Sequence, residues 1–137
     1  MKLMLDTNIC VALIKSKPAQ ILRQLLPHRV GDVGISWVTL AELEFGVANS
    51  QQVEKNRAAL DEFILPLEIA YPNDNTARAY GHLRAYLQKK GTPIGSHDTI
   101  IGAHALALGV TLVTNKVREF SRVPGLPVID WLAEKKR

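Results

Sequence analysis

Three carboxylates occupy positions at which predicted secondary-structure elements begin or end. Asp6 directly follows a short apolar run, residues 3–5, and precedes a helical segment. Glu42 lies about one turn inside one predicted helix, and Asp98 lies in the first turn of another. Each also has an ordinary structural explanation. Asp6 is a good helix N-cap, and Glu42 completes a capping-box pattern with Thr39. The positive end of the helix dipole favours Asp98.

Taken together, these carboxylates indicate a metal site. In open α/β sheets, ligands bind beyond the carboxyl ends of the strands. Two unit charges about 4 Å apart interact by roughly 4 kcal/mol at an effective dielectric of 20, so a converging acidic cluster requires a cation. Carboxylates are hard oxygen ligands that suit Mg²⁺ or Mn²⁺, and bound magnesium keeps waters that can attack a phosphodiester. The residues favour metal-dependent phosphodiester chemistry, with helix capping as the open alternative.

Other common catalytic signatures are absent from the sequence. There is no G-x-G-x-x-G, no G-x-x-x-x-G-K-[ST] and no G-x-S-x-G. The histidines lack metal-ligand spacing with Cys10, which we expect to be a small core residue. His104 lies on an apolar helix and is expected in the core or an interface, whereas His97 could take part in a site with Asp98. A phosphatase with an aspartyl nucleophile would prefer the sequence Asp-x-Asp after the first strand. Asn8 occupies the position of the second Asp, which argues against this class of enzyme.

Hydrophobic periodicity predicts strands that alternate with helices. Five strands are expected. The first ends at Asp6, and the others span residues 33–36, 65–70, 110–113 and 127–129. Helices are expected at 7–16, from Pro18 onward, from Ser36 or Thr39 to 49, and at 53–63, 75–90 and 97–108. Such alternation predicts an α/β fold with a mainly parallel sheet and helices on both faces, in one domain spanning residues 1–137.

Composition adds few constraints. The 137 residues are 47% hydrophobic and 22% charged, as in an ordinary globular protein. No apolar run approaches the roughly 18 residues of a membrane span, and no signal peptide is recognised. The single Cys10 is simplest to explain in a reducing compartment, so we expect a cytoplasmic protein. The net charge of +4 permits a nucleic-acid partner without showing one, because residues 134–137 alone contribute +2.

Four motifs, in their order and spacing, resemble VapC-type PIN-domain toxins. They are Met4-Leu5-Asp6-Thr7-Asn8-Ile9, Thr39-Leu40-Ala41-Glu42-Leu43-Glu44-Phe45-Gly46, Gly91-Thr92-Pro93-Ile94-Gly95 with Asp98, and Leu112-Val113-Thr114-Asn115 followed by Arg118-Glu119-Phe120 and Asp130-Trp131. The resemblance covers essentially the whole chain. It implies a three-layer α/β/α sandwich and a Mg²⁺- or Mn²⁺-dependent endoribonuclease, the toxin of a type II toxin–antitoxin pair that cleaves structured RNA, with transfer RNA as the expected substrate.

The resemblance also assigns residues and partners. Asp6, Glu42 and Asp98 match the catalytic, metal-binding positions. Thr7, Asn8 and Thr114 match polar positions nearby, and Asn115 and Lys116 are expected to complete the supporting polar shell. A homodimer is implied, as is a VapB-like antitoxin whose tail occupies the active groove and with which the toxin forms a higher-order complex.

Lys116 departs from the family pattern, which usually has Asn or Asp at this position. An ammonium has no lone pair to offer a metal. Lys116 could contact the scissile phosphate, replace a second cation, or damage the site; the last outcome would leave a protein that binds RNA and antitoxin without cutting. Lys116, Arg118 and Arg122 could also form a basic rim that binds RNA phosphates in a salt-dependent manner, with an ordinary solvated turn as the alternative.

Overall fold

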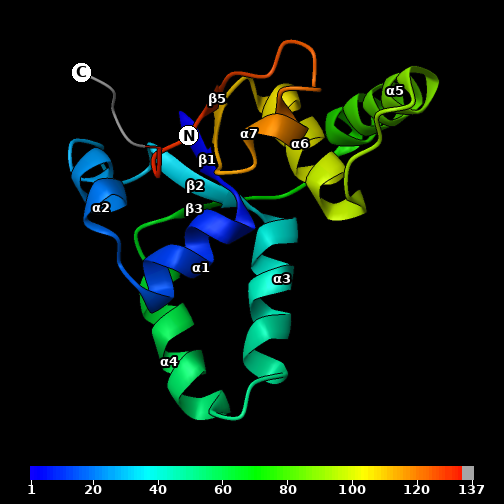
Figure 1. Ribbon diagram of the computed structural model, residues 1–137. Helices are drawn as coiled ribbons and strands as arrows, with labels where there is room; N and C mark the ends of the chain where they lie inside the picture. Colours follow the sequence, from blue (N-terminus) through cyan, green and yellow to red (C-terminus); the bar gives the residue numbers. More distant parts are fainter. Residues whose placement is uncertain (134–137) are drawn as a thin grey trace.

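A computed structural model describes residues 1–133 of the chain, so the basic residues 134–137 lie outside the described part. The centre of the fold is a five-stranded sheet in the order β3-β2-β1-β4-β5 (Figure 1). Every strand pair is parallel, and Leu3 of β1 is in register with Val33 of β2 and Thr111 of β4. The strands are β1 Leu3–Leu5, β2 Val33–Ser36, β3 Glu68–Ala70, β4 Thr111–Val113 and β5 Val128–Ile129.

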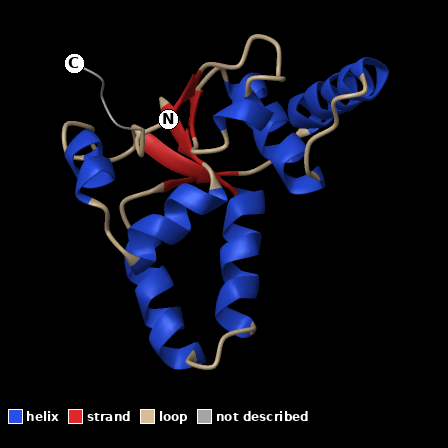
Figure 2. Ribbon diagram, viewed as in Figure 1, coloured by secondary structure: helices blue, strands red, loops and turns tan. Residues whose placement is uncertain are grey.

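Helices cover both faces of this sheet (Figure 2). They are α1 Thr7–Lys15, α2 Ala19–Leu25, α3 Trp37–Ala48, α4 Val53–Ile64, α5 Asp74–Lys90, α6 Ser96–Leu108 and α7 Val117–Phe120. Alternate residues of β1 enter different cores: Leu5 packs with α1 and α4, and Met4 packs with α5 and α6. The predicted three-layer α/β/α sandwich with a parallel sheet is therefore confirmed. Within residues 1–133, no helix combines the length and the apolar character needed to span a bilayer.

Most predicted elements form close to their expected bounds. Strand β3 is the main correction, because it begins at Glu68 and not at Leu65. Leu65 instead caps the C-terminus of α4, and the Leu67 N–H donates to Ile64 in a turn. Sequence periodicity also missed α7, a helix of four residues that is too short for a periodic pattern.

Two interior predictions are confirmed. Cys10 is fully buried, and burial raises the pKa of its thiol well above the ordinary range, as expected for an inert core residue. His104 is buried on α6 and lies 2.8 Å from the Ser36 hydroxyl.

Gly34 lets β2 and β3 pair, because a Cβ at this position would collide with the Glu68 carbonyl group.

Candidate active site

Asp6 lies at the carboxyl end of the central strand and is 2% exposed. One carboxylate oxygen, Oδ1, accepts the Ile9 N–H at 3.0 Å and so caps α1. The other oxygen accepts a hydrogen bond from the Thr114 hydroxyl, which follows β4. Burial raises the pKa of Asp6; the bonds from Thr114 and Ile9 lower it, and the nearby charge of Asp98 raises it again. Capping and ligand binding are compatible, since each carboxylate oxygen keeps a further lone pair.

Asp98 and Lys116 form an ion pair beside Asp6. The Lys116 Nζ lies 2.9 Å from Asp98 Oδ2. The Lys116 side chain is 37% exposed, and the Asp98 side chain is 18% exposed. The Lys116 backbone N–H donates to the Thr114 hydroxyl oxygen at 2.9 Å. The hydrogen bond with Asp98 raises the pKa of Lys116, as does the charge of Asp6 to a smaller extent. Lys116 therefore carries its full positive charge within the acidic site.

Glu42 is held by two side chains from other helices. The Thr7 hydroxyl donates to Glu42 Oε1 at 2.6 Å, and His97 Nδ1 lies 3.3 Å from Oε2. The capping-box interpretation of Glu42 is wrong, because Ser36 caps α3 through the Val38 N–H. Ser36 precedes Trp37, so the helix starts before Thr39 and places Glu42 beyond its first turn. The hydroxyl of Thr39 lies 3.3 Å from that of Thr7 instead.

The acidic residues fall into two neighbouring groups. Asp6, Asp98 and Lys116 form one, and Glu42 with Thr7 and His97 forms the other. Among residues 1–133, no three His, Cys, Asp or Glu side chains come close enough together to hold a metal jointly. Convergence of all three carboxylates on one ion remains a prediction.

The donor chemistry of the first group fits a hard divalent cation. Asp6 and Asp98 present carboxylate oxygens, and Lys116 neutralises only one of these two negative charges. A buried carboxylate that lacks a charged partner is costly, so Asp6 is the natural place for a cation. Magnesium and manganese accept such oxygens and keep waters in their other positions.

The remaining predicted residues lie at the edge of the site. Asn8, Asn115 and Arg118 are exposed. Arg122 donates one guanidinium N–H to the Pro93 carbonyl at 3.1 Å, so it ties the loop before α6 to the segment after α7. The predicted basic rim remains a prediction.

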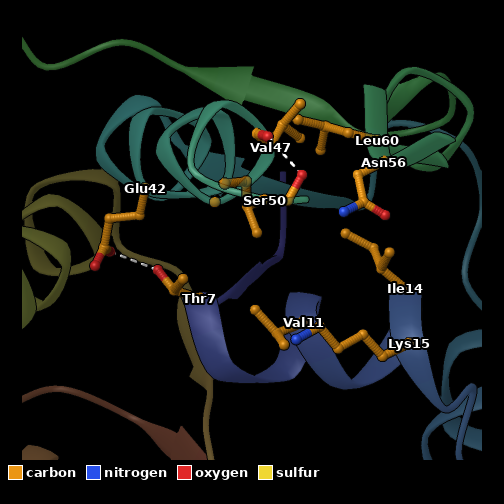
Figure 3. A pocket seen from close by; sticks show the side chains of 11 residues that line it. Thr7, Val11, Ile14, Lys15, Glu42, Val47, Ser50, Asn56 and Leu60 are labelled. Atoms are coloured by element: carbon orange, nitrogen blue, oxygen red, sulfur yellow. Dashed lines mark hydrogen bonds between the residues drawn. The ribbon is translucent and has the colours of Figure 1, made fainter. Parts of the chain in front are cut away.

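A cavity of about 230 Å³ adjoins Glu42 between α1, α3 and α4 (Figure 3). Thr7 and Glu42 stand at one end of it, and the rest of its wall is mainly apolar, with Val11, Val47 and Leu60. A second hollow on the other side of Glu42 is lined by His97 and by exposed Trp37 and Phe45. Apolar surface therefore flanks the acidic site on two sides.

This fold and site define a class: a parallel sheet covered by helices on both faces, with a cluster of acidic side chains at its carboxyl edge. The PIN domain family matches residues 3–126. The chain is 41% identical over 131 residues to the tRNA(fMet)-specific endonuclease VapC of Salmonella typhimurium, covering 96% of this chain and 98% of that relative. It is 42% identical over 129 residues to Ribonuclease VapC2 of Rickettsia felis, covering 93% and 96%.

Solved structures agree with these relatives. The DNA-bound VapBC of Salmonella typhimurium superposes with a TM-score of 0.92 at 40% identity, covering 96% of this chain and 98% of that chain. VapBC-1 of nontypeable Haemophilus influenzae gives a TM-score of 0.89 at 35% identity, covering 97% and 100%. The chain belongs to the PIN domain family, among its VapC-type ribonucleases.

The sequence suggested His97 as a possible site residue beside Asp98 but did not predict its contact with Glu42. Its neighbour Asp98 was the only signal in the sequence, and contact with Glu42 depends on the approach of α6 to α3. A histidine directly before an acidic first-turn residue projects from the same helix end, and this could have strengthened the prediction.

Proposed function

We propose that this protein is the toxin of a VapBC-type toxin–antitoxin pair and hydrolyses a phosphodiester of structured RNA, with transfer RNA as the substrate. The observation that carries the proposal is the buried Asp6 beside Asp98, in a chain 41% identical to a tRNA(fMet)-specific endonuclease. We further propose that the enzyme works in the cytoplasm and that it requires Mg²⁺ or Mn²⁺.

In the proposed mechanism, Asp6 and Asp98 would hold the divalent ion. When bound, the ion supplies a water of lowered pKa and neutralises charge on the phosphate. Thr114 orients the Asp6 carboxylate, since its hydroxyl donates to one oxygen. Glu42 would orient the attacking water or serve as a further ligand of the ion, and Thr7 and His97 hold the Glu42 carboxylate in position.

The partners follow from the relatives and from the surface beside the site. The similar solved structures are VapBC complexes, so we propose a VapB-like antitoxin for this chain. The apolar cavity next to Glu42 can accept side chains of an antitoxin tail, which would block the site. A homodimer, and a larger complex with antitoxin, complete the proposed assembly.

Substitution of the carboxylates tests this function. Asp6→Asn and Asp98→Asn preserve side-chain shape, and asparagine at position 6 can still cap α1, so both variants should fold. We expect cleavage of total transfer RNA in Mg²⁺ to fall at least ~100-fold in each, because a metal ligand loses its charge. The control is Asp74→Asn, an exposed carboxylate in the first turn of α5. Undiminished cutting by either site variant would reject the assignment.

A second candidate function is a binding protein that no longer cuts RNA. The observation in its favour is the contact between Lys116 and Asp98, which engages an oxygen that the metal site needs. If the wild-type protein is inert on transfer RNA and Lys116→Asn cuts, this second function is correct. Cleavage by the wild type excludes it.

A further inference from the structure

Lys116 points into the acidic site and not outward. Its ammonium lies 2.9 Å from Asp98 Oδ2, and its side chain is only 37% exposed. Its backbone N–H is bonded to the Thr114 hydroxyl oxygen, and that hydroxyl donates to Asp6. The start of the side chain is therefore anchored to the same residue that orients Asp6.

The ammonium already fills one cation position. Asp98 Oδ2 is engaged by Lys116, and an ammonium cannot share a lone pair with a metal. A second divalent ion on that oxygen would lie within a few ångströms of the Lys116 ammonium. Repulsion between cations a few ångströms apart is strong in a site that is partly shielded from water.

The charge of the site leads to the same conclusion. Asp6 and Asp98, the two carboxylates beside Lys116, contribute two formal negative charges and Lys116 one positive, which leaves a net −1. One divalent ion already reverses that charge. A second would make this group strongly positive before any RNA phosphate arrives.

We propose that Lys116 is a built-in monovalent cation that takes the place of a second metal ion on Asp98, so that the site binds a single divalent ion next to Asp6. The proposal rests on the proposed function, since it assumes that Asp6 and Asp98 form the metal site. Lys116 then has a function of its own, because its ammonium is always present and neutralises Asp98 when divalent ions are scarce.

Mn²⁺ binding to the full chain, without RNA, tests the proposal. Isothermal titration calorimetry and electron paramagnetic resonance should find one Mn²⁺ per wild-type chain. In Lys116→Asn we expect a second Mn²⁺, or binding of the first at least ~10-fold tighter, because a nearby positive charge is gone. Lys116→Arg keeps the charge and should resemble the wild type. Lys89→Asn removes a lysine from exposed α5 and controls for net charge.

Thermal unfolding provides a second measurement. In EDTA, Lys116→Asn should melt below the wild type, because Asp6 and Asp98 then repel each other without the ammonium. Added Mn²⁺ should raise the melting temperature of this variant more than that of the wild type. Two Mn²⁺ in the wild type, or identical stoichiometry and affinity in Lys116→Asn, would overturn the role of Lys116 and leave the proposed function intact. If no variant binds Mn²⁺ at all, the metal site itself fails and the proposed function fails with it.

Discussion

The Thr114 hydroxyl joins the Asp6 carboxylate to the Lys116 backbone, so Thr114→Val should weaken both folding and metal binding. The side chain is buried, and valine has nearly the same shape. The substitution removes the donor to Asp6 and the acceptor for the Lys116 N–H. A hydrogen bond to a charged group contributes about 1.5–3 kcal/mol and a neutral one about 0.5–1.5 kcal/mol. The free energy of unfolding should therefore fall by roughly 2–4.5 kcal/mol.

The effect on the metal follows from the orientation of Asp6. A residue that holds a metal ligand in place typically contributes about 10–100-fold to affinity, so Mn²⁺ affinity should fall within that range. In the native protein, the hydrogen bond from Thr114 lowers the pKa of Asp6. Thr114→Val removes this bond and should therefore raise the pKa of Asp6 further.

Urea unfolding in EDTA and Mn²⁺ titration measure the two effects separately. Thr114→Ser keeps the hydroxyl and should retain most of both properties. Thr111→Val, at the start of β4, is the matched control for a threonine-to-valine change. A loss of less than about 0.5 kcal/mol in Thr114→Val, together with unchanged Mn²⁺ affinity, would refute the view that this hydroxyl organises the site.

Two further predictions concern histidines. Burial lowers the pKa of His104 below its ordinary value of 6.5, so the unfolded chain takes up a proton first as the pH falls. Its stability contribution is therefore present above pH 6.5 and is lost on acidification, by at most about 1.4 kcal/mol per pH unit. Urea unfolding from about pH 7.5 to 5.5 should show a shallower loss in His104→Gln than in the wild type; parallel slopes would contradict this. His97→Ala should lower kcat for transfer RNA by at least ~10-fold, because Glu42 loses a partner, and should change stability by under about 1 kcal/mol, because the contact is half-exposed. The exposed His82→Ala is its control, and an unchanged kcat would exclude a positioning role.

The sequence by itself determined the fold class and the position of Asp6. Apolar runs of strand length alternate with helical periodicity, and both signals are local. Asp6 follows the first apolar run and caps the next helix, so its place at the carboxyl end of a strand could be read from its neighbours. Gly109 ends α6 in the left-handed conformation, as a glycine directly after a helical apolar pattern commonly does.

Only the tertiary structure decided which side chains meet. Thr114 reaches Asp6 across 108 residues of sequence because β4 pairs directly with the central β1. The fold also brings Lys116, just after β4, within 2.9 Å of Asp98 on α6, a contact that the motif alone did not predict. Strand order and helix approach depend on packing of the whole core, and no local periodicity encodes them. The residue types of the site were therefore readable from the sequence, and their partnerships required the fold.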